Sequence, residues 1–350
     1  MKKILIPLLG LAVMVSCGTA KTSEGASAQS TQSVSVAKGD KAFLAAYKTI
    51  KSDELKKNLY VIASDEMAGR DTGSPGQKKA GEYMVDYYKS LGITPPKALG
   101  SYYQKVPAEF MKKRGGGNLP DSENILAFIE GSEKPEEIIV ISAHYDHVGT
   151  RNGVVYNGAD DDGSGTVAVM QIAKAFQEAK KAGNGPKRSI LFLHVTGEEH
   201  GLFGSEYYTS NPVFPLANTV VDLNIDMIGR DDAANRGKQY VYVIGSEMLS
   251  SQLKVINEAA NKKTNNLELN YKYDDPADPE QLYYRSDHYN FAKNNVPVAF
   301  FFDGIHEDYH KPTDDPEKID YPLLEKRAQL VFATAWEIAN RAERIVVDKK

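Results

Sequence analysis

The feature that most constrains the fold is a repeated alternation between short apolar runs and longer stretches with helical periodicity. The helical stretches include 165–179, 249–261 and 323–343, and the apolar runs between them have the length of strands. Such alternation is typical of a largely parallel sheet with helices on both faces. We therefore predict an α/β fold, a single three-layer αβα domain with a mostly parallel, mixed central sheet. The predicted strands are 124–130, 137–142, 189–195, 220–225, 239–244 and 296–302.

The segment that precedes this alternation has a different character. Residues 40–91 show helical spacing on both sides of a turn-rich loop at 67–76. The whole chain has 350 residues and a formal net charge of −5, which argues against a nucleic-acid-binding protein because that function requires a basic face. The only cysteine excludes an intrachain disulfide.

The N-terminus reads as an export signal. Lys2 and Lys3 are followed by an apolar run that is too short to span about 30 Å of hydrocarbon. Cys17 follows Met14-Val15-Ser16, which resembles a bacterial lipobox. We predict a lipoprotein signal peptide at 1–17 with Cys17 as the lipidation site, a flexible Ser/Thr/Ala/Gln-rich tether at 18–37, and a catalytic domain at 38–350. A short membrane anchor and a free thiol are the alternatives.

Polar side chains follow four of the predicted strands. The carboxyl ends of parallel strands meet at one edge of a sheet, so these side chains are expected to converge there. A further cluster, Asp160-Asp161-Asp162, opens the helix at 165–179, and three adjacent carboxylates repel one another unless a cation compensates them. The residues after the strands are His144, Glu198 with Glu199, Asp226 and His310.

Imidazole and carboxylate groups are the ligands that zinc prefers at catalytic sites. Two zinc ions carry a charge of +4 and three carboxylates carry −3, so a bridging hydroxide would neutralise the centre. Two metals about 3.5–4 Å apart generate such a nucleophile at neutral pH. Individual strand-end acids are often helix caps, as Asp160 or Asp162 would be, and a lone strand-end histidine is more often structural. The predicted ligands are His144, Asp161 in the bridging position, Glu199, Asp226 and His310.

A second metal motif competes with this set. His306-Glu307-Asp308-Tyr309-His310 matches H-E-x-x-H, in which a helix places both histidines on one face and the glutamate acts as the base. Here a strand-like run leads in and Pro312 follows, which disfavours a continuing helix. If this motif were the site, Glu307 would be essential and Glu198 dispensable.

As a set, the motifs resemble the co-catalytic di-zinc exopeptidases of metallopeptidase family 28. That family includes bacterial leucyl aminopeptidases, glutamate carboxypeptidase and glutaminyl cyclase, and the resemblance extends over about 59–343. It implies the zinc-peptidase (phosphorylase/hydrolase-like) architecture. The residues that carry it are His144-Tyr145-Asp146, the Gly158–Gly165 segment, the Gly197–Ser205 segment, Asp226-Met227 and Tyr309-His310.

The resemblance also implies a role for each residue. His144 and Asp226 would bind one zinc ion, Glu199 and His310 the other, and Asp161 both. Glu198 would activate the zinc-bridging water as the general base, Tyr309 would stabilise the oxyanion, and Asp146 would accept the second N–H of His144. The resemblance places Asp287 near the site. We expect the remaining histidines to be structural, namely His147, His194, His200 and His288.

These residues predict a zinc-dependent exopeptidase, with aminopeptidase as the favoured specificity. Its substrate would be a peptide, its cofactors two Zn²⁺ ions, and its only membrane contact the lipid anchor in the cell envelope, periplasmic or at the outer membrane. Arg285 is a candidate for binding a substrate carboxylate, which would indicate a carboxypeptidase or dipeptidase. Two competing functions are a glutaminyl cyclase-like acyltransferase and a non-catalytic lipoprotein that binds peptides.

Overall fold

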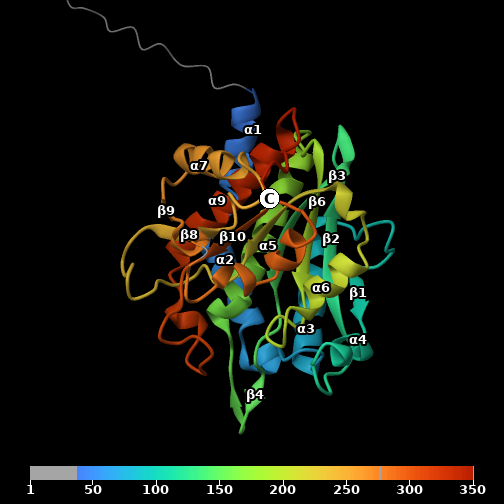
Figure 1. The fold of residues 1–350 in the computed structure, drawn as a ribbon, viewed down its shortest axis with the longest axis vertical. Helices are drawn as coiled ribbons and strands as arrows, with labels where there is room; N and C mark the ends of the chain where they lie inside the picture. The colour runs from blue at the N-terminus through green and yellow to red at the C-terminus, as the bar shows by residue number, and fades with distance from the viewer. Residues whose placement is uncertain (1–37, 276, 350) are drawn as a thin grey trace, which may run out of the picture. The chain divides into compact units, whose positions relative to one another are not determined.

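The computed structural model of the chain describes residues 38–275 and 277–349. The predicted signal peptide, the lipidation site Cys17 and the tether lie outside the described residues. Figure 1 shows a central sheet flanked by helices. The strands are β1 (Tyr103–Val106), β2 (Ser122–Ile129), β3 (Lys134–His144), β4 (Thr150–Arg151), β5 (Val154–Val155), β6 (Arg188–Val195), β7 (Thr219–Ile225), β8 (Tyr240–Ile244), β9 (Glu268–Asn270) and β10 (Val298–Phe302). The helices are α1 (Lys38–Tyr47), α2 (Ser52–Ile62), α3 (Pro75–Leu91), α4 (Ala108–Lys113), α5 (Gly165–Lys181), α6 (Phe203–Ser210), α7 (Leu253–Lys263), α8 (His288–Ala292) and α9 (Tyr321–Asn340).

The main sheet has eight strands in the order β1-β2-β6-β3-β7-β10-β8-β9. The four central strands, β6, β3, β7 and β10, run parallel to one another. On one side β2 is antiparallel to β6 and β1 is antiparallel to β2. On the other side β8 is antiparallel to β10. The predicted mostly parallel, mixed sheet is therefore confirmed, and all four central strands end at the same edge.

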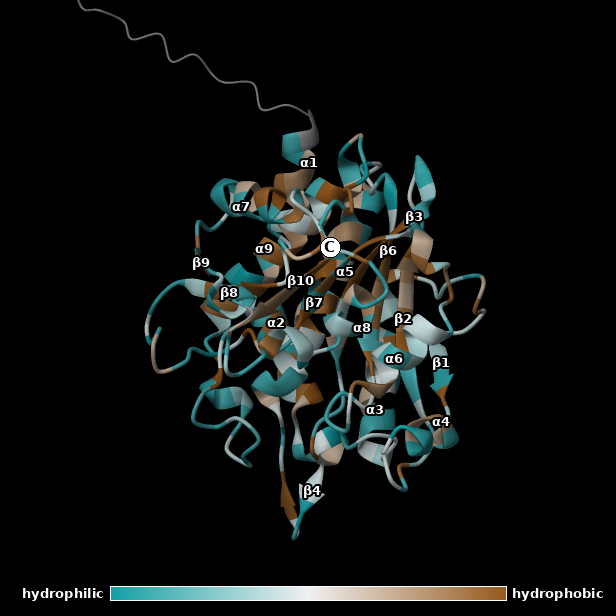
Figure 2. Cartoon of the chain, in the orientation of Figure 1, coloured by the Kyte–Doolittle hydropathy of each residue, from teal (hydrophilic) through white to brown (hydrophobic). Residues whose placement is uncertain are grey.

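Side chains of successive strand residues pack into different layers. In β3, Ile139 and Ile141 face the large core formed with α2, α3, α5 and α9, whereas Ile138 and Val140 face a smaller core that includes residues of α6 and α8. Figure 2 shows the corresponding brown strands between helices whose outer faces are teal. Because both faces of these strands are covered, their sequences are continuous apolar runs rather than alternating ones.

Local signals explain the ends of the helices. The α3 helix begins where Ser74 Oγ accepts a hydrogen bond from the Gln77 amide and Pro75 occupies the first turn. It ends at Gly92, whose φ of +74° is the left-handed conformation that glycine adopts readily. Asp320 caps α9 in the same way by accepting from the Leu323 amide.

The sequence pattern did not predict the edge strands β1 and β9 or the short helices α4, α6 and α8. β1 and β9 span only Tyr103–Val106 and Glu268–Asn270, and such short segments lack a resolvable period. Among the described residues, no helix is long and apolar enough to cross a membrane.

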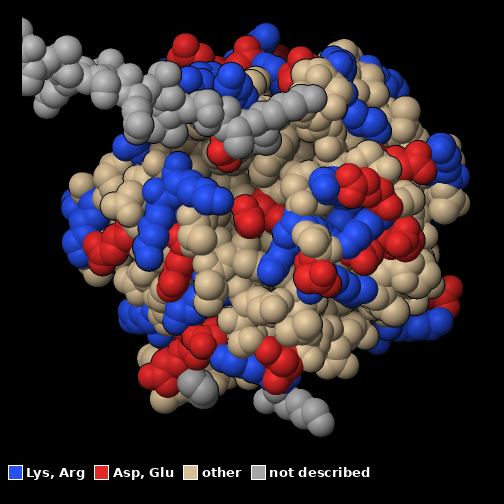
Figure 3. Space-filling view, turned by 90° about the horizontal axis from the view of Figure 1, so that it is seen from above, with Lys and Arg blue, Asp and Glu red and all other residues tan. Residues whose placement is uncertain are grey.

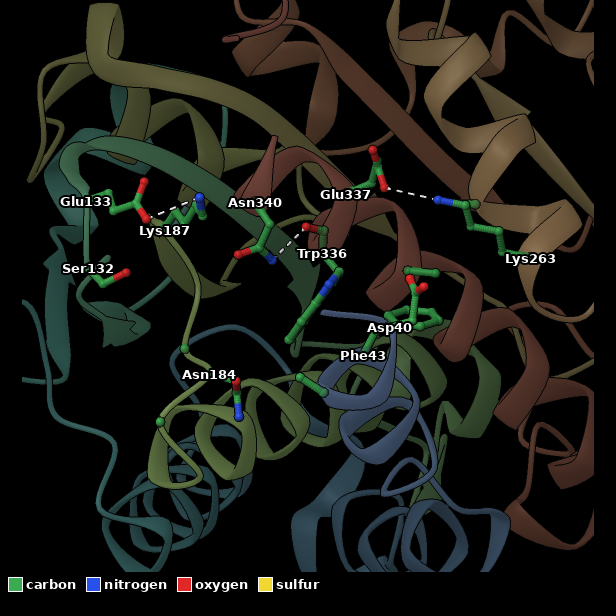
Figure 4. A pocket seen from close by; sticks show the side chains of 15 residues that line it. Asp40, Phe43, Ser132, Glu133, Asn184, Lys187, Lys263, Trp336, Glu337 and Asn340 are labelled. Carbon is green, nitrogen blue, oxygen red and sulfur yellow. Dashed lines mark hydrogen bonds and ion pairs between the residues drawn. The ribbon is translucent and has the colours of Figure 1, made fainter. Parts of the chain in front are cut away.

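A cavity of about 450 Å³ lies beside Phe43 and Trp336 (Figure 4). Its lining includes Glu133 and Lys187, which lie at the amino ends of β3 and β6 and form an ion pair of 3.1 Å. Because Glu133 and Lys187 directly precede parallel strands, this cavity lies at the sheet edge opposite to the one where the parallel strands end.

Figure 3, which views the molecule from the side of α1, shows Lys and Arg side chains interspersed with Asp and Glu.

Candidate metal centre

The predicted polar residues converge at the carboxyl edge of the central strands. His144 is the last residue of β3, Glu198 and Glu199 follow β6, and Asp226 directly follows β7. His310 lies in the turn-containing segment after β10. Because these strands are parallel neighbours, residues that are far apart in the sequence come within contact distance.

His144 forms the first group of ligand atoms. Its Nε2 lies 3.2 Å from Asp161 Oδ1 and 3.5 Å from Asp226 Oδ1. One imidazole nitrogen and two carboxylate oxygens thus surround a common point, and the three residues are buried. This is the donor chemistry of a zinc ion.

His310 forms the second group. Its Nε2 lies 3.0 Å from Asp161 Oδ2 and 3.0 Å from Glu199 Oε2. The two oxygens of Asp161 therefore face different imidazoles, Oδ1 towards His144 and Oδ2 towards His310. Of the three consecutive aspartates, the middle one occupies the position between the two groups.

The flanking aspartates have other partners. Asp162 Oδ1 accepts hydrogen bonds from the amides of Gly165 and Met227, so it caps the start of α5. Asp160 accepts from the Gly229 amide and lies 3.1 Å from the ring of His306. Both residues shape the loop that presents Asp161.

The orientation of His144 differs in one detail from the prediction. Its Nδ1 lies 3.1 Å from the backbone carbonyl oxygen of Asp146 but 3.8 Å from the carboxylate. We infer that Nδ1–H donates to the carbonyl, which leaves Nε2 free for a metal. The Asp146 carboxylate instead accepts from the Glu198 amide at 3.3 Å and from Thr72 Oγ1 at 2.8 Å, so it positions the segment that carries Glu198 and Glu199.

Sequence reasoning missed Ser286, which supports the first group. Ser286 Oγ donates to Asp226 Oδ2 at 2.7 Å and accepts from Asn224 Nδ2 at 2.9 Å. Its neighbour Asp287 is buried and accepts a hydrogen bond from Ser205 Oγ. Ser286, and not Asp287, therefore donates to Asp226. Burial raises the pKa of Asp287 to about 7.

The electrostatics of the site reflect the crowding of acids and imidazoles. Burial disfavours a charged His144, but the charges of Glu198 and Asp226 outweigh it and raise the pKa of His144 well above its usual value. Burial also opposes charge on His310, yet its close contacts with the carboxylates of Asp161 and Glu199 raise its pKa to about 10. Burial, reinforced by the charges of Asp226 and Glu199, raises the pKa of Glu198 well above the normal range.

Several buried atoms of the site have no hydrogen-bond partner among the described residues. They include His144 Nε2, Asp161 Oδ2 and Glu199 Oε1. Buried polar atoms are rarely left without a partner. Because the same atoms lie at the centre of the two groups and are of the types that bind zinc, the residues present fit a metal centre.

The H-E-x-x-H motif does not form a site. Residues 306–310 are not helical. His306 is buried against Asp160, and Glu307 is exposed and pairs with Arg236 at 3.4 Å. His310 contacts Asp161 and Glu199 whereas His306 contacts Asp160, so the two histidines do not share one metal position as this motif requires.

A third imidazole, that of His147, lies at the site. It forms a candidate metal-binding group with Asp161 and Glu199. The sequence alone favours a structural role for His147, and its position three residues after His144 at a strand end is the signal that could have identified it. The other histidines lie outside these groups: His194 contacts Tyr88 Oη, His200 contacts Asp71, and His288 stacks on Phe300.

A cavity opens onto the first group. Its lining combines Glu198, Asp161 and Asp226 with apolar side chains, and Tyr309 and Arg285 also line it. Tyr309 stacks on His310 with ring centroids 3.9 Å apart. Arg285 is partly exposed and forms an ion pair of 3.5 Å with Glu280. The apolar part of the lining comprises Met227, Leu282, Phe300, Phe302 and Ile305.

Comparison with known proteins identifies the family. Residues 124–335 match peptidase family M28. The chain belongs to this family. The predicted resemblance is thereby confirmed. The match begins in β2 and ends in α9, so it includes every residue of the candidate metal centre.

Proteins similar to this M28 chain include named aminopeptidases. A probable leucine aminopeptidase from Arthroderma otae is 30% identical over 224 residues, which are 62% of this chain and 57% of that protein. The chain thus spans little more than half of that relative's length. The LapA aminopeptidase of Legionella pneumophila has a similar fold, with a TM-score of 0.66 and 18% identity over 93% of this chain and 81% of that one.

The fold is also shared with an enzyme of different activity. A glutaminyl cyclase from Bacteroides thetaiotaomicron matches with a TM-score of 0.61 and 17% identity over 82% of this chain and 98% of that one. At such identities the likeness shows the fold alone, and one fold hosts several chemistries. The choice of activity therefore depends on the residues of the site.

Proposed function

We propose that this M28 chain is a zinc-dependent aminopeptidase that holds two zinc ions. The observation that carries the proposal is the position of Asp161, whose two carboxylate oxygens face separate imidazole and carboxylate groups. In this proposal His144 and Asp226 hold one ion, Glu199 and His310 hold the other, and Asp161 contacts both. When bound, zinc polarises the scissile carbonyl and lowers the pKa of water.

Glu198 is the proposed general base. Its Oε2 lies 3.9 Å from His144 Nε2, and its side chain lines the cavity beside the ligand group without being part of it. A carboxylate in this position accepts a proton from the attacking water and passes it to the leaving nitrogen. Burial raises the pKa of Glu198, which favours uptake of a proton by its carboxylate.

Tyr309 is the proposed donor to the oxyanion. It lines the same cavity as Glu198, and burial together with the charges of Asp161 and Glu198 raises its pKa above the usual value. The phenol therefore keeps its proton and donates a hydrogen bond to the oxygen on which negative charge develops.

An aminopeptidase must accept the positively charged α-ammonium group of its substrate. Asp226 and Glu198, which line the cavity, provide carboxylate oxygens for that group. The apolar residues of the same lining, such as Phe300 and Phe302, suit an apolar N-terminal side chain. These features support release of apolar N-terminal residues from peptides.

The decisive experiment compares Glu198→Gln with Glu307→Gln. We expect Glu198→Gln to lower kcat by about 10²–10⁴-fold on an aminoacyl-arylamide while zinc content is unchanged, because a base but no ligand is lost. Glu307→Gln is the matched control, since Glu307 is exposed and remote from the acidic cluster, and it should retain wild-type turnover. The reverse pattern would support the H-E-x-x-H motif and refute the proposal.

Two other specificities are outcomes of substrate tests. Arg285 lines the cavity, and if it binds a substrate carboxylate, Arg285→Ala will raise KM for dipeptides but not for arylamides. That result would establish a dipeptidase or carboxypeptidase. Release of ammonia from N-terminal glutamine peptides, without cleavage of the chain, would instead identify a glutaminyl cyclase-like enzyme.

We also propose that the enzyme is exported and anchored in the cell envelope through a lipid on Cys17. The support is the sequence Met1–Cys17, with its basic start, apolar run and single cysteine. Fatty-acid labelling of the wild type and of Cys17→Ser tests this. The wild type should incorporate label and partition into detergent, and equal labelling of both proteins would refute it.

A further inference from the structure

His147 lies inside the second half of the candidate metal centre. Its Nδ1 is 2.7 Å from Glu199 Oε1 and 3.7 Å from Asp161 Oδ2, and the side chain is completely buried. Asp161 Oδ2 also faces His310, whereas His310 contacts the other oxygen of Glu199, Oε2. The imidazole therefore shares both carboxylates with the second group.

The contact between His147 and Glu199 is not a well-formed hydrogen bond. Neither ring nitrogen of His147 has a hydrogen-bond partner among the described residues, and neither does Glu199 Oε1. His288 also lacks partners, but its ring stacks on Phe300 with centroids 4.7 Å apart, so its surroundings are apolar. Two buried atoms of zinc-binding type that lie close together and lack hydrogen-bond partners suit a common ion.

Packing holds the His147 ring in this position. A Cβ at Gly158 would lie 2.5 Å from Cγ and Cδ2 of His147, so the glycine backbone is packed directly against the ring. The amide of His147 donates to the Arg70 carbonyl at 3.2 Å, and its ring meets that of His310 edge-on with centroids 5.8 Å apart. A rigidly held imidazole is pre-organised for a metal.

We propose that His147 Nδ1 is a further ligand of the zinc ion held by Glu199 and His310. This inference rests on the dinuclear centre proposed above. The second half of the site would then have two imidazoles, whereas the half built on His144 has one. The side chain of His310 is 38% exposed, so this ligand is only partly shielded from solvent. An additional buried ligand would strengthen the binding of the ion at this half.

The test compares His147→Ala and His147→Asn with the control His200→Ala. Asparagine places an amide N–H where Nδ1 stands, so it can donate a hydrogen bond to Glu199 but does not replace a zinc ligand. His200 is adjacent to Glu199 in sequence but contacts Asp71 instead. Zinc content by elemental analysis and zinc affinity by chelator competition are measured on the full chain, together with the absorption spectrum of the cobalt(II) form.

We expect His147→Ala and His147→Asn to lower the binding affinity of one of the two zinc ions by at least about 100-fold and to change the cobalt spectrum. The affinity of the other ion should not change in these variants, and His200→Ala should bind both ions like the wild type. Recovery of affinity in His147→Asn would show that His147 only donates to Glu199, and unchanged affinity in both variants would show no role. Either result overturns the inference.

X-ray absorption of the wild type covers the case in which the variants fail to fold. Three imidazoles shared by two ions give on average about 1.5 per zinc, and about 1 per zinc would overturn the inference. A wild type that binds a single zinc ion would overturn the dinuclear centre itself. Two bound ions with an unaffected His147→Ala would overturn only the role of His147.

Discussion

The two halves of the metal centre use similar side chains but are constructed differently. His144 and Asp226 lie at the ends of the neighbouring strands β3 and β7, and their side chains are 1% and 12% exposed. His310 comes from a loop, its side chain is 38% exposed, and its backbone has a φ of +54°. Left-handed backbone at a residue other than glycine costs about 1–3 kcal/mol and is found where the surrounding structure enforces it. The first half is thus part of the sheet, and the second is held by loops.

If the centre holds two ions, as proposed above, ligand identity alone would not decide how firmly each ion is held. A ligand supported by the sheet keeps its position when the metal leaves, and it is shielded from water and chelators. A ligand on an exposed loop has less support from packing. Asp161 connects the two halves, and it therefore provides the most severe test of the comparison.

Asp161→Ala should have the largest effect. Both halves lose a carboxylate oxygen, so we expect the loss of both zinc ions and a fall in activity to background. The buried imidazoles also lose a carboxylate that compensates their charge. Elemental analysis of the purified variant measures this. Wild-type zinc content in Asp161→Ala would contradict the shared position of Asp161.

Metal removal should occur in two steps. A chelator is expected to take the ion of the His310 half first because that half is partly exposed, and the ion of the His144 half later because it is enclosed. Stopped-flow chelation with a zinc indicator resolves the phases. His310→Ala should eliminate the fast phase and leave the slow one, and a single phase in the wild type would show that the halves are equivalent.

Ser286→Ala should affect the sheet-supported half alone. The variant removes the hydroxyl that donates to Asp226 Oδ2, and loss of such a supporting contact typically lowers metal affinity by about 10–100-fold. Only the slow phase of chelation should therefore accelerate. Ser90→Ala, at an exposed serine of α3 that bonds to its own helix, is the matched control.

Zinc binding at pH 7 should release protons. The pKa of His310 is about 10 and that of His144 is raised in the metal-free protein, so both imidazoles are protonated there, whereas a zinc ligand must be neutral. Calorimetry in buffers of different ionisation enthalpy counts the protons, and the release from His310 should disappear as the pH rises through about 10.

For the same reason, His310 stabilises the metal-free fold at neutral and acidic pH and loses this contribution as the pH rises through its folded pKa. Metal binding without proton release would contradict these shifts.

Particular residues show how far the sequence could be followed. His144, the Glu198-Glu199 pair and Asp226 were predictable because each directly follows an apolar run, and parallel strands place such residues at one edge. The position of Asp161 between two imidazoles could be proposed but not distinguished from that of Asp160 or Asp162, because the loop geometry assigns the flanking carboxylates to Gly165 and to His306. Ser286 was missed as a supporting residue, since nothing in its local pattern separates it from an ordinary buried serine. His147 was assigned a structural role, although its position three residues after His144 at a strand end was a signal for the site.

Local sequence determined the elements of this protein: apolar period, caps and turn residues set the strands and helices, and the order of the strands along the chain placed acids and imidazoles at their ends. Only the tertiary structure decided which atoms of those residues meet. The reason is physical, because propensity and periodicity act over a few neighbouring residues, whereas the distances between His144, Asp161 and His310 depend on how β3, α5 and the loop after β10 pack. That packing assigned Asp146 to the support of Glu198, placed His306 against Asp160 and brought His147 beside Asp161 and Glu199.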